Sequence, residues 1–151
     1  MKIVQPIREL RQIESMKCIL KKNPRDLLLF VMGINTALRI SDLLTLTVGD
    51  IRDERGKLRA FVTLREGKTG KLKRFPLNNA ILVILKAYLK LDRDMGDSSF
   101  LFASNKGGGM PITRTHAWRI LSAAARQAGL NEIGTHTLRK TFGYHAYRRT
   151  K

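Results

Sequence analysis

Apolar residues recur at helical spacing over much of this chain. After Pro6 they come every three or four positions as far as Lys22, which predicts an amphipathic helix with the proline in its first turn. Asn23 and Pro24 form a typical helix start. The strongly apolar run over 27–34 then predicts a buried central helix.

The pattern changes between residues 51 and 77. Just before this segment, Ser41 is a plausible N-cap for a short third helix. Short apolar runs broken by glycine then predict two or three antiparallel strands, over 58–64 and 72–77. A lysine-bearing hairpin at 67–70 joins them.

Helical spacing returns in the second half of the chain. Asn78 or Asn79 caps one predicted helix, and Thr113 caps another, on which we interpret Trp118 as a core residue and not as a platform for base stacking. A final helix begins near Thr135. The glycine-rich loop between the first two lacks the Lys-Ser/Thr ending of a phosphate-binding P-loop.

These elements predict an α+β fold, in which one mainly α-helical domain over residues 1–151 carries a small inserted antiparallel sheet. A hydrophobic content of 43% excludes a disordered basic tail. No apolar run approaches the ~20 residues of a membrane span, and no signal peptide is evident. The single cysteine, Cys18, excludes an internal disulfide, so we expect a cytoplasmic protein without a membrane partner.

Charge then narrows the choice of partner. Twenty-nine Lys and Arg against twelve Asp and Glu give a net charge of +17, which favours nucleic acid through counterion release. The excess is uneven: residues 52–74 hold nine basic side chains and three acidic ones, and residues 99–151 hold nine and one. We therefore expect a directional positive field.

Three short segments carry candidate chemistry in a fixed order. They are Thr-Ala-Leu-Arg-Ile-Ser-Asp-Leu-Leu at 36–44, Gly-Lys at 67–68 with Arg-Phe-Pro-Leu at 74–77, and Thr-His-Thr-Leu-Arg at 135–139. Each string alone is common, but the ordered set around a basic hairpin is specific. Together the segments resemble the catalytic domain of the tyrosine recombinases, the phage integrase family of site-specific DNA recombinases.

Two arginines suit the chemistry of a phosphodiester. Displacement at phosphorus builds charge on the nonbridging oxygens, which planar guanidinium groups bind in pairs, so Arg39 and Arg139 are the expected clamp. Loss of one such donor typically slows the reaction by about 10²- to 10³-fold. Asp42, three residues after Arg39, is expected to orient that arginine, where the family more often has Glu.

The resemblance implies further roles. Lys68 is the general acid for the leaving sugar oxygen, and its basic neighbours are expected to lower its pKa. His136, expected on the same helical face as Arg139, binds phosphate or moves the proton of the nucleophile. The remaining DNA-binding candidates are Lys71, Lys73, Arg74, Arg114 and Lys140.

The resemblance also implies a covalent 3′-phosphotyrosine, so no cofactor or metal is expected. The nucleophilic tyrosine of the family follows the second arginine at a distance that this sequence does not reach, and we expect a domain cut short. Tyr144 and Tyr147 continue the helix of Arg139; at ~1.5 Å per residue Tyr147 lies about 12 Å along it, too far for in-line attack. We expect double-stranded DNA as the partner, a monomer in solution for this chain, and a tetramer on DNA for the complete enzyme.

Simpler interpretations stay open for each residue. Arg39 and Asp42 are also an ordinary surface pair, Lys68 a solvated hairpin lysine, and His136 a helix cap. For the whole chain, the alternatives are a type IB topoisomerase-like DNA cleavage domain and a non-catalytic basic nucleic-acid-binding protein. The second alternative predicts that Arg39 and Arg139 matter no more than other basic residues.

Overall fold

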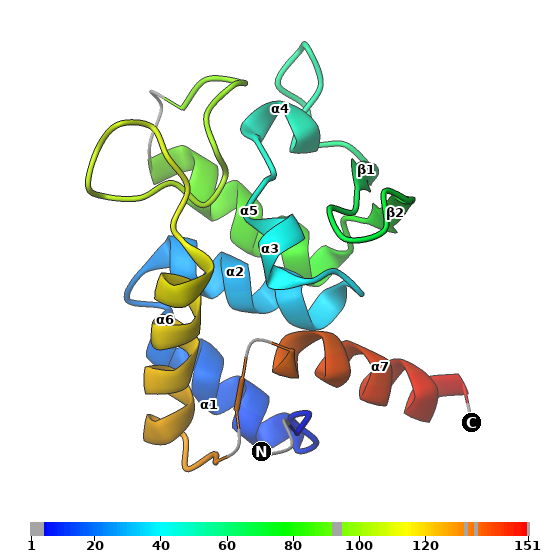
Figure 1. Cartoon of the computed structure of the whole chain (residues 1–151), viewed down its shortest axis with the longest axis vertical. Helices are drawn as coiled ribbons and strands as arrows, with labels where there is room; N and C mark the ends of the chain where they lie inside the picture. The colour runs from blue at the N-terminus through cyan, green and yellow to red at the C-terminus, as the bar shows by residue number, and fades with distance from the viewer. Residues whose placement is uncertain (1–4, 92–94, 132, 135, 151) are drawn as a thin grey trace.

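The computed structural model describes residues 5–91, 95–131, 133–134 and 136–150. The elements in chain order are α1 (Leu10–Leu20), α2 (Pro24–Asn35), α3 (Ile40–Leu43), α4 (Val48–Ile51), β1 (Phe61–Arg65), β2 (Leu72–Pro76), α5 (Asn79–Leu91), α6 (Arg114–Gln127) and α7 (Thr137–Thr150). Figure 1 shows α2 crossing the middle of the molecule, with the hairpin above it and α7 below. Mainly helical structure with one two-stranded antiparallel sheet confirms the predicted fold class.

Helix α2 forms the centre of the core. The Asn23 side chain accepts hydrogen bonds from the N–H groups of Arg25 and Asp26. Pro24 occupies the first turn, where a backbone N–H has no intrahelical acceptor, so proline loses no hydrogen bond there. Residues 28–33 of this helix are buried, and α1, α5, α6 and α7 all contact it. The predicted cap and the buried central helix are confirmed.

The hairpin forms as predicted, with shifted ends. β1 and β2 pair antiparallel, with Thr63 opposite Arg74, and the side chains alternate between core and surface. Those that face the core are Val62, Leu64 and Phe75. The first strand begins at Phe61 and not at Leu58, because Leu58 forms an isolated bridge with Arg52.

The first helix is shorter than predicted. It begins at Leu10, because the segment from Pro6 leaves helical geometry to pack against α7. Ile7 is buried there, its N–H donates to the Thr141 hydroxyl at 2.9 Å, and its carbonyl lies 2.9 Å from His145 Nε2. The start of the chain is thus tied to the last helix.

The short helices also differ from expectation. The N-cap position of α3 is held by Arg39, and Ser41 lies inside the helix, exposed. The sequence pattern did not indicate α4, although Thr47 and Asp50 form a complete capping box at its start. A four-residue helix has no apolar periodicity to detect, so only its caps could have revealed it.

Two predicted caps in the second half are confirmed and one core assignment is wrong. Asn78 accepts an N–H bond from the first turn of α5, and Thr113 does the same for α6. Trp118 is 42% exposed, because it lies beside the buried face of α6 and not on it. That face consists of Ala117, Leu121, Ala124 and Ala125. The expected start of the last helix, Thr135, lies outside the described residues.

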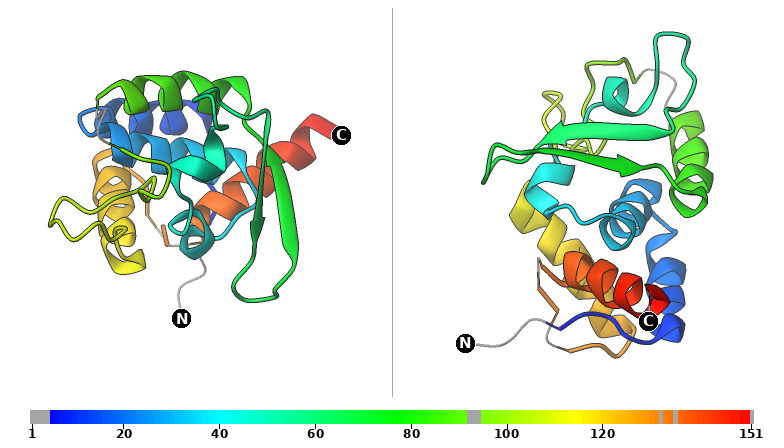
Figure 2. Two further views of the ribbon diagram at one scale, coloured as in Figure 1. Left: turned by 90° about the horizontal axis from the view of Figure 1, so that it is seen from above. Right: turned by 90° about the vertical axis from the view of Figure 1, so that its right-hand side faces the viewer.

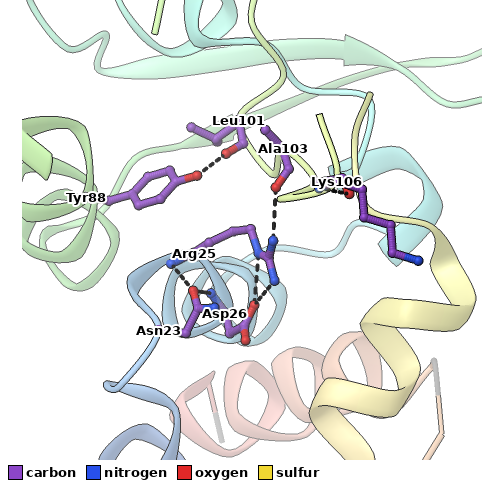
Figure 3. Close-up of polar contacts among 8 residues, drawn as sticks. Asn23, Arg25, Asp26, Tyr88, Leu101, Ala103 and Lys106 are labelled. Atoms are coloured by element: carbon purple, nitrogen blue, oxygen red, sulfur yellow. Dashed lines mark hydrogen bonds and ion pairs between the residues drawn. The ribbon is translucent and has the colours of Figure 1, made fainter. Parts of the chain in front are cut away.

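A polar cluster at the N-terminal end of α2 fastens the long loop before α6 (Figure 3). Arg25 is buried, pairs with Asp26 at 3.0 Å and donates to the Ala103 carbonyl at 3.0 Å. Tyr88 donates to the Leu101 carbonyl at 2.7 Å. These bonds satisfy loop carbonyls that would otherwise be buried without a donor.

Two properties concern the part of the chain that the structure describes. None of its helices combines the length and apolarity needed to cross a membrane. Nor do its His, Cys, Asp and Glu side chains gather in threes where they could ligate a metal ion.

Candidate phosphodiester-binding site

Three elements from distant parts of the sequence meet on one side of α2. They are the start of α3, the turn of the hairpin between β1 and β2, and the first turn of α7. Figures 1 and 2 show α3 next to the N-terminal end of α7, with the hairpin turn reaching towards α3. Bonds from Arg39 to Glu66 and from Gly67 to Asp42 join the first two predicted segments, and the third begins α7, which packs against the same helix α2.

Arg39 is held at the start of α3 by an ion pair. Its Nη1 donates to Glu66 Oε2 at 2.7 Å, a length typical of a charge-assisted bond. The Arg39 side chain is 20% exposed, whereas that of Glu66 is 4% exposed. The guanidinium is therefore anchored from the protein side and keeps contact with solvent.

The Asp42 contact differs from the one expected. Its Oδ1 accepts a hydrogen bond from the Gly67 N–H at 3.0 Å, so the carboxylate of Asp42 holds the hairpin turn and Glu66, not Asp42, pairs with Arg39. Its Oδ2 is buried and accepts no hydrogen bond from the described residues. A buried carboxylate oxygen without a donor is costly, which makes Asp42 a notable feature of this site.

Lys68 lies at the tip of the hairpin turn and is exposed. The turn is closed by a bond from the Gly70 N–H to the Glu66 carbonyl at 2.8 Å and by one from the Glu66 N–H to the Lys71 carbonyl at 2.8 Å. Gly70 has a φ of 70°, a conformation that favours glycine. The ammonium group is thus carried on a closed, glycine-containing turn beside Arg39.

The first turn of α7 carries the other two candidates. His136 is exposed and stands at the N-cap position, where its carbonyl accepts the Lys140 N–H at 3.0 Å. Arg139 is half-buried, one turn further along the helix. Leu138 between them is buried against Gly33 of α2, where it fills the space that a side chain would occupy. This contact sets the position of Arg139.

The DNA-binding candidates lie on the hairpin and in the first turns of α6 and α7. Lys71 and Arg74 are exposed on the hairpin and Lys73 is half-buried, while Arg114 and Lys140 are exposed at the starts of α6 and α7. Arg74 stacks on the Phe61 ring at 4.0 Å. A cavity of about 340 Å³ between the hairpin, the end of α2 and α7 is lined by three cations, Lys73, Arg74 and Arg149. The hairpin and α7 therefore line one basic cavity together.

The tyrosines of α7 have other contacts. Tyr144 accepts a hydrogen bond from Arg148 at 3.1 Å, and the guanidinium groups of Arg8 and Arg148 each lie 5.7 Å from its ring centroid. Its ring also meets His145 edge to face at 5.0 Å. Tyr147 is 62% exposed. Tyr144 is accordingly a packing residue in this structure.

Sequence reasoning missed Glu66. It stands directly before the glycine-lysine pair of the hairpin turn, but an ion pair between residues 39 and 66 leaves no local pattern. The available signal was that Glu66 is an isolated acid within the basic segment 52–74, where an acidic side chain is expected to pair with a neighbouring cation.

The chain thus combines a mainly helical core with an inserted basic hairpin whose turn is bonded to Arg39 and Asp42 at α3. The sequence matches the phage integrase family over residues 8–150, and the chain belongs to this family. The probable integrase/recombinase YoeC of Bacillus subtilis is 46% identical over 152 residues, which cover 100% of this chain and 79% of that protein. The tyrosine recombinase XerA of Pyrococcus furiosus is 35% identical over 130 residues, 85% of this chain but 43% of that protein.

Solved structures show the same fold. A crystal structure of XerA recombinase matches with a TM-score of 0.79 at 18% identity, over 99% of this chain and 53% of that one. The XerH recombinase bound to its difH substrate matches with a TM-score of 0.71 at 22% identity, over 98% and 44%. The chain therefore spans about half the length of these structures.

Proposed function

We propose that this chain forms the phosphate-binding part of the catalytic site of a site-specific DNA recombinase. The observation that carries the proposal is that Arg39 and Asp42 are bonded to the turn of Lys68, while α3 and α7 both pack against α2. Family membership supports it, because the relatives are named as integrases and tyrosine recombinases. Double-stranded DNA is the proposed partner.

In the proposed reaction a tyrosine hydroxyl of the complete enzyme attacks the scissile phosphorus. The bond from phosphorus to the 5′ oxygen breaks, and a 3′-phosphotyrosine forms. Arg39 and Arg139 bind the nonbridging oxygens, where charge develops. Lys68 donates a proton to the departing 5′ oxygen, and His136 binds phosphate or accepts the proton of the nucleophile.

Assembly and location follow from the same proposal. The chain binds DNA as a monomer in the cytoplasm, and four copies of the complete enzyme act together during strand exchange. One structural neighbour, with a TM-score of 0.70 at 17% identity, is a lambda integrase tetramer bound to a Holliday junction, which supports the second part. Sedimentation of the chain with and without a duplex tests the first part.

Alanine variants test whether Arg39 and Arg139 contribute more to DNA binding than other basic residues do. Arg39→Ala and Arg139→Ala are each expected to weaken binding to a short duplex more than Arg55→Ala or Lys57→Ala, both of which remove exposed charges on the loop before β1. Each loss of a phosphate contact should also reduce the slope of log affinity against log salt by about 1. Equal effects for all four variants would favour the non-catalytic alternative.

A covalent trapping experiment tests the tyrosines. With a suicide DNA substrate that releases its cleaved end, neither Tyr144 nor Tyr147 is expected to form an adduct. The reason is that Tyr144 is packed between Arg8 and Arg148 and Tyr147 extends further along the same helix. A phosphotyrosine peptide that contains either residue, identified by mass spectrometry, would contradict this part of the proposal.

A further inference from the structure

We propose that Glu66 is a positioning residue that holds Arg39 and the turn carrying Lys68 as one unit, so that both cations meet the same phosphate. The inference rests on the proposed function, since it concerns how that phosphate site is assembled. Glu66 belongs to neither the paired arginines nor the lysine of the family motif.

The first step is the direction from which Glu66 reaches Arg39. Its side chain is 4% exposed and that of Arg39 is 20% exposed, so the carboxylate contacts the inner side of the guanidinium. Arg39 and Glu66 share one hydrogen bond, from Arg39 Nη1 to Glu66 Oε2 at 2.7 Å. A guanidinium is a planar fork with several donors, so a carboxylate behind it leaves donors for a phosphate in front.

The second step is that Glu66 is also part of the Lys68 turn. Its N–H donates to the Lys71 carbonyl at 2.8 Å, and its carbonyl accepts the Gly70 N–H at 2.8 Å. Its Oε1 accepts a longer bond from the Thr69 hydroxyl at 3.3 Å. One residue thereby fixes both the backbone of the turn and the guanidinium next to it.

A second carboxylate completes the attachment. Asp42 Oδ1 accepts the Gly67 N–H at 3.0 Å, so the residue directly before Lys68 is bound to α3. Arg39 and Asp42 therefore hold the turn from the two ends of the same short helix. Without Glu66, one of these two attachments is lost and the turn can move relative to Arg39.

The competing view is that Glu66 occupies the place of the phosphate and must leave when DNA binds. A carboxylate in that place would share the solvent exposure of the arginine that it covers, but Glu66 is the more buried partner. The two views also predict opposite effects on DNA binding, which makes them separable by experiment.

Amide hydrogen exchange tests the attachment without DNA. In Glu66→Ala, the N–H groups of Gly67 and Gly70 are expected to exchange at least about 10-fold faster, with no change in α2, because only the turn opens locally. Glu66→Gln, which keeps the shape and loses the charge, should give a smaller increase in the same direction. Glu54→Gln, on an exposed loop, is the matched control and should change neither amide.

Coupling to Arg39 is tested with the double variant. Arg39→Ala alone should speed exchange at Gly67 and Gly70, and Arg39→Ala with Glu66→Gln should be no faster than the stronger single variant. Unchanged exchange in Glu66→Ala, or additive effects in the double variant, would overturn the proposal.

Salt titrations of binding to a short mixed-sequence duplex provide the second readout. Glu66→Gln removes a negative charge, so simple electrostatics and the competing view both predict tighter binding and an equal or steeper salt slope. Positioning predicts the reverse, a slope reduced by about 1 for each phosphate contact that is lost. A steeper or unchanged slope overturns the proposal. If instead Arg39→Ala itself leaves the slope unchanged, the proposed phosphate site fails, while the exchange data still decide the role of Glu66.

Discussion

Replacing Gly33 with alanine tests the contact that positions Arg139. A Cβ atom at this position would lie 2.2 Å from Leu138 Cδ1 and 3.0 Å from Leu138 Cβ. The first of these atoms can move with the side chain, but Leu138 Cβ is fixed by the backbone of α7. The alanine methyl group therefore has to displace the first turn of α7, in which Arg139 is the next residue.

The magnitude follows from two opposing effects. Overpacking a buried contact typically costs about 1–3 kcal/mol, and replacing glycine by alanine inside a helix contributes about 1 kcal/mol of stability. Gly143→Ala is the matched control, because Gly143 lies within α7 and a Cβ there would meet nothing within 4 Å. Gly143→Ala should show only the gain in helix stability. The difference in the free energy of unfolding between the two variants therefore isolates an overpacking cost of about 1–3 kcal/mol.

Urea unfolding monitored by circular dichroism measures this difference, and duplex binding measures its consequence. Gly33→Ala is expected to unfold at a lower urea concentration than Gly143→Ala and to bind DNA with a shallower salt dependence, since Arg139 is displaced. If both variants gain stability equally, the close contact between α2 and α7 does not hold, and the account of how Arg139 is placed is refuted.

Three other outcomes are expected. Thr141→Val should lower the free energy of unfolding by about 1–3 kcal/mol, because it leaves the buried Ile7 N–H without an acceptor, whereas Thr141→Ser should keep most of the stability. Asn23→Ala should cost about 1 kcal/mol in urea unfolding through loss of the α2 cap, and an undiminished stability would show that the cap is unimportant. Hydrogen bonds from the backbone N–H groups of Lys57 and Arg55 lower the pKa of Asp53 below its ordinary 3.8, so its contribution to stability is present above that pH and lost as the pH falls through the lowered pKa; an NMR titration midpoint at or above 3.8 would contradict this.

Local signals predicted local structure well in this chain. Asn23 and Thr113 are confirmed as caps because a capping side chain bonds to residues two or three positions away. The hairpin turn is confirmed for a similar reason, as its closing bonds join residues 66–71. Such local features can be predicted from the sequence, although the equally local capping box of α4 was missed and Ser41 is not the cap of α3.

Predictions failed where tertiary packing decides the outcome. Pro6 suits a helix start, but the buried Ile7 takes its partners from α7, more than a hundred residues away. Trp118 fits a helical apolar pattern, yet it lies beside the buried face of α6 and is exposed. The Arg39 partner was assigned to Asp42 by sequence proximity, while the pairing depends on the hairpin folding back onto α3.

The buried acidic residues distinguish Arg39 from the other arginines better than the basic residues do. Among the described residues, the buried acids are Asp26, Asp42 and Glu66, and a buried carboxylate is tolerated only when paired or hydrogen-bonded. Asp26 pairs with Arg25, whose side chain is 8% exposed and bound to a loop carbonyl, so that pair serves the fold. Glu66 pairs with Arg39, which keeps a fifth of its side-chain surface open beside Lys68. The chain has twenty-nine basic residues. Arg39 is distinguished from a nonspecific contact to the duplex, because Glu66 holds its guanidinium from the protein side while part of its side chain stays exposed to solvent.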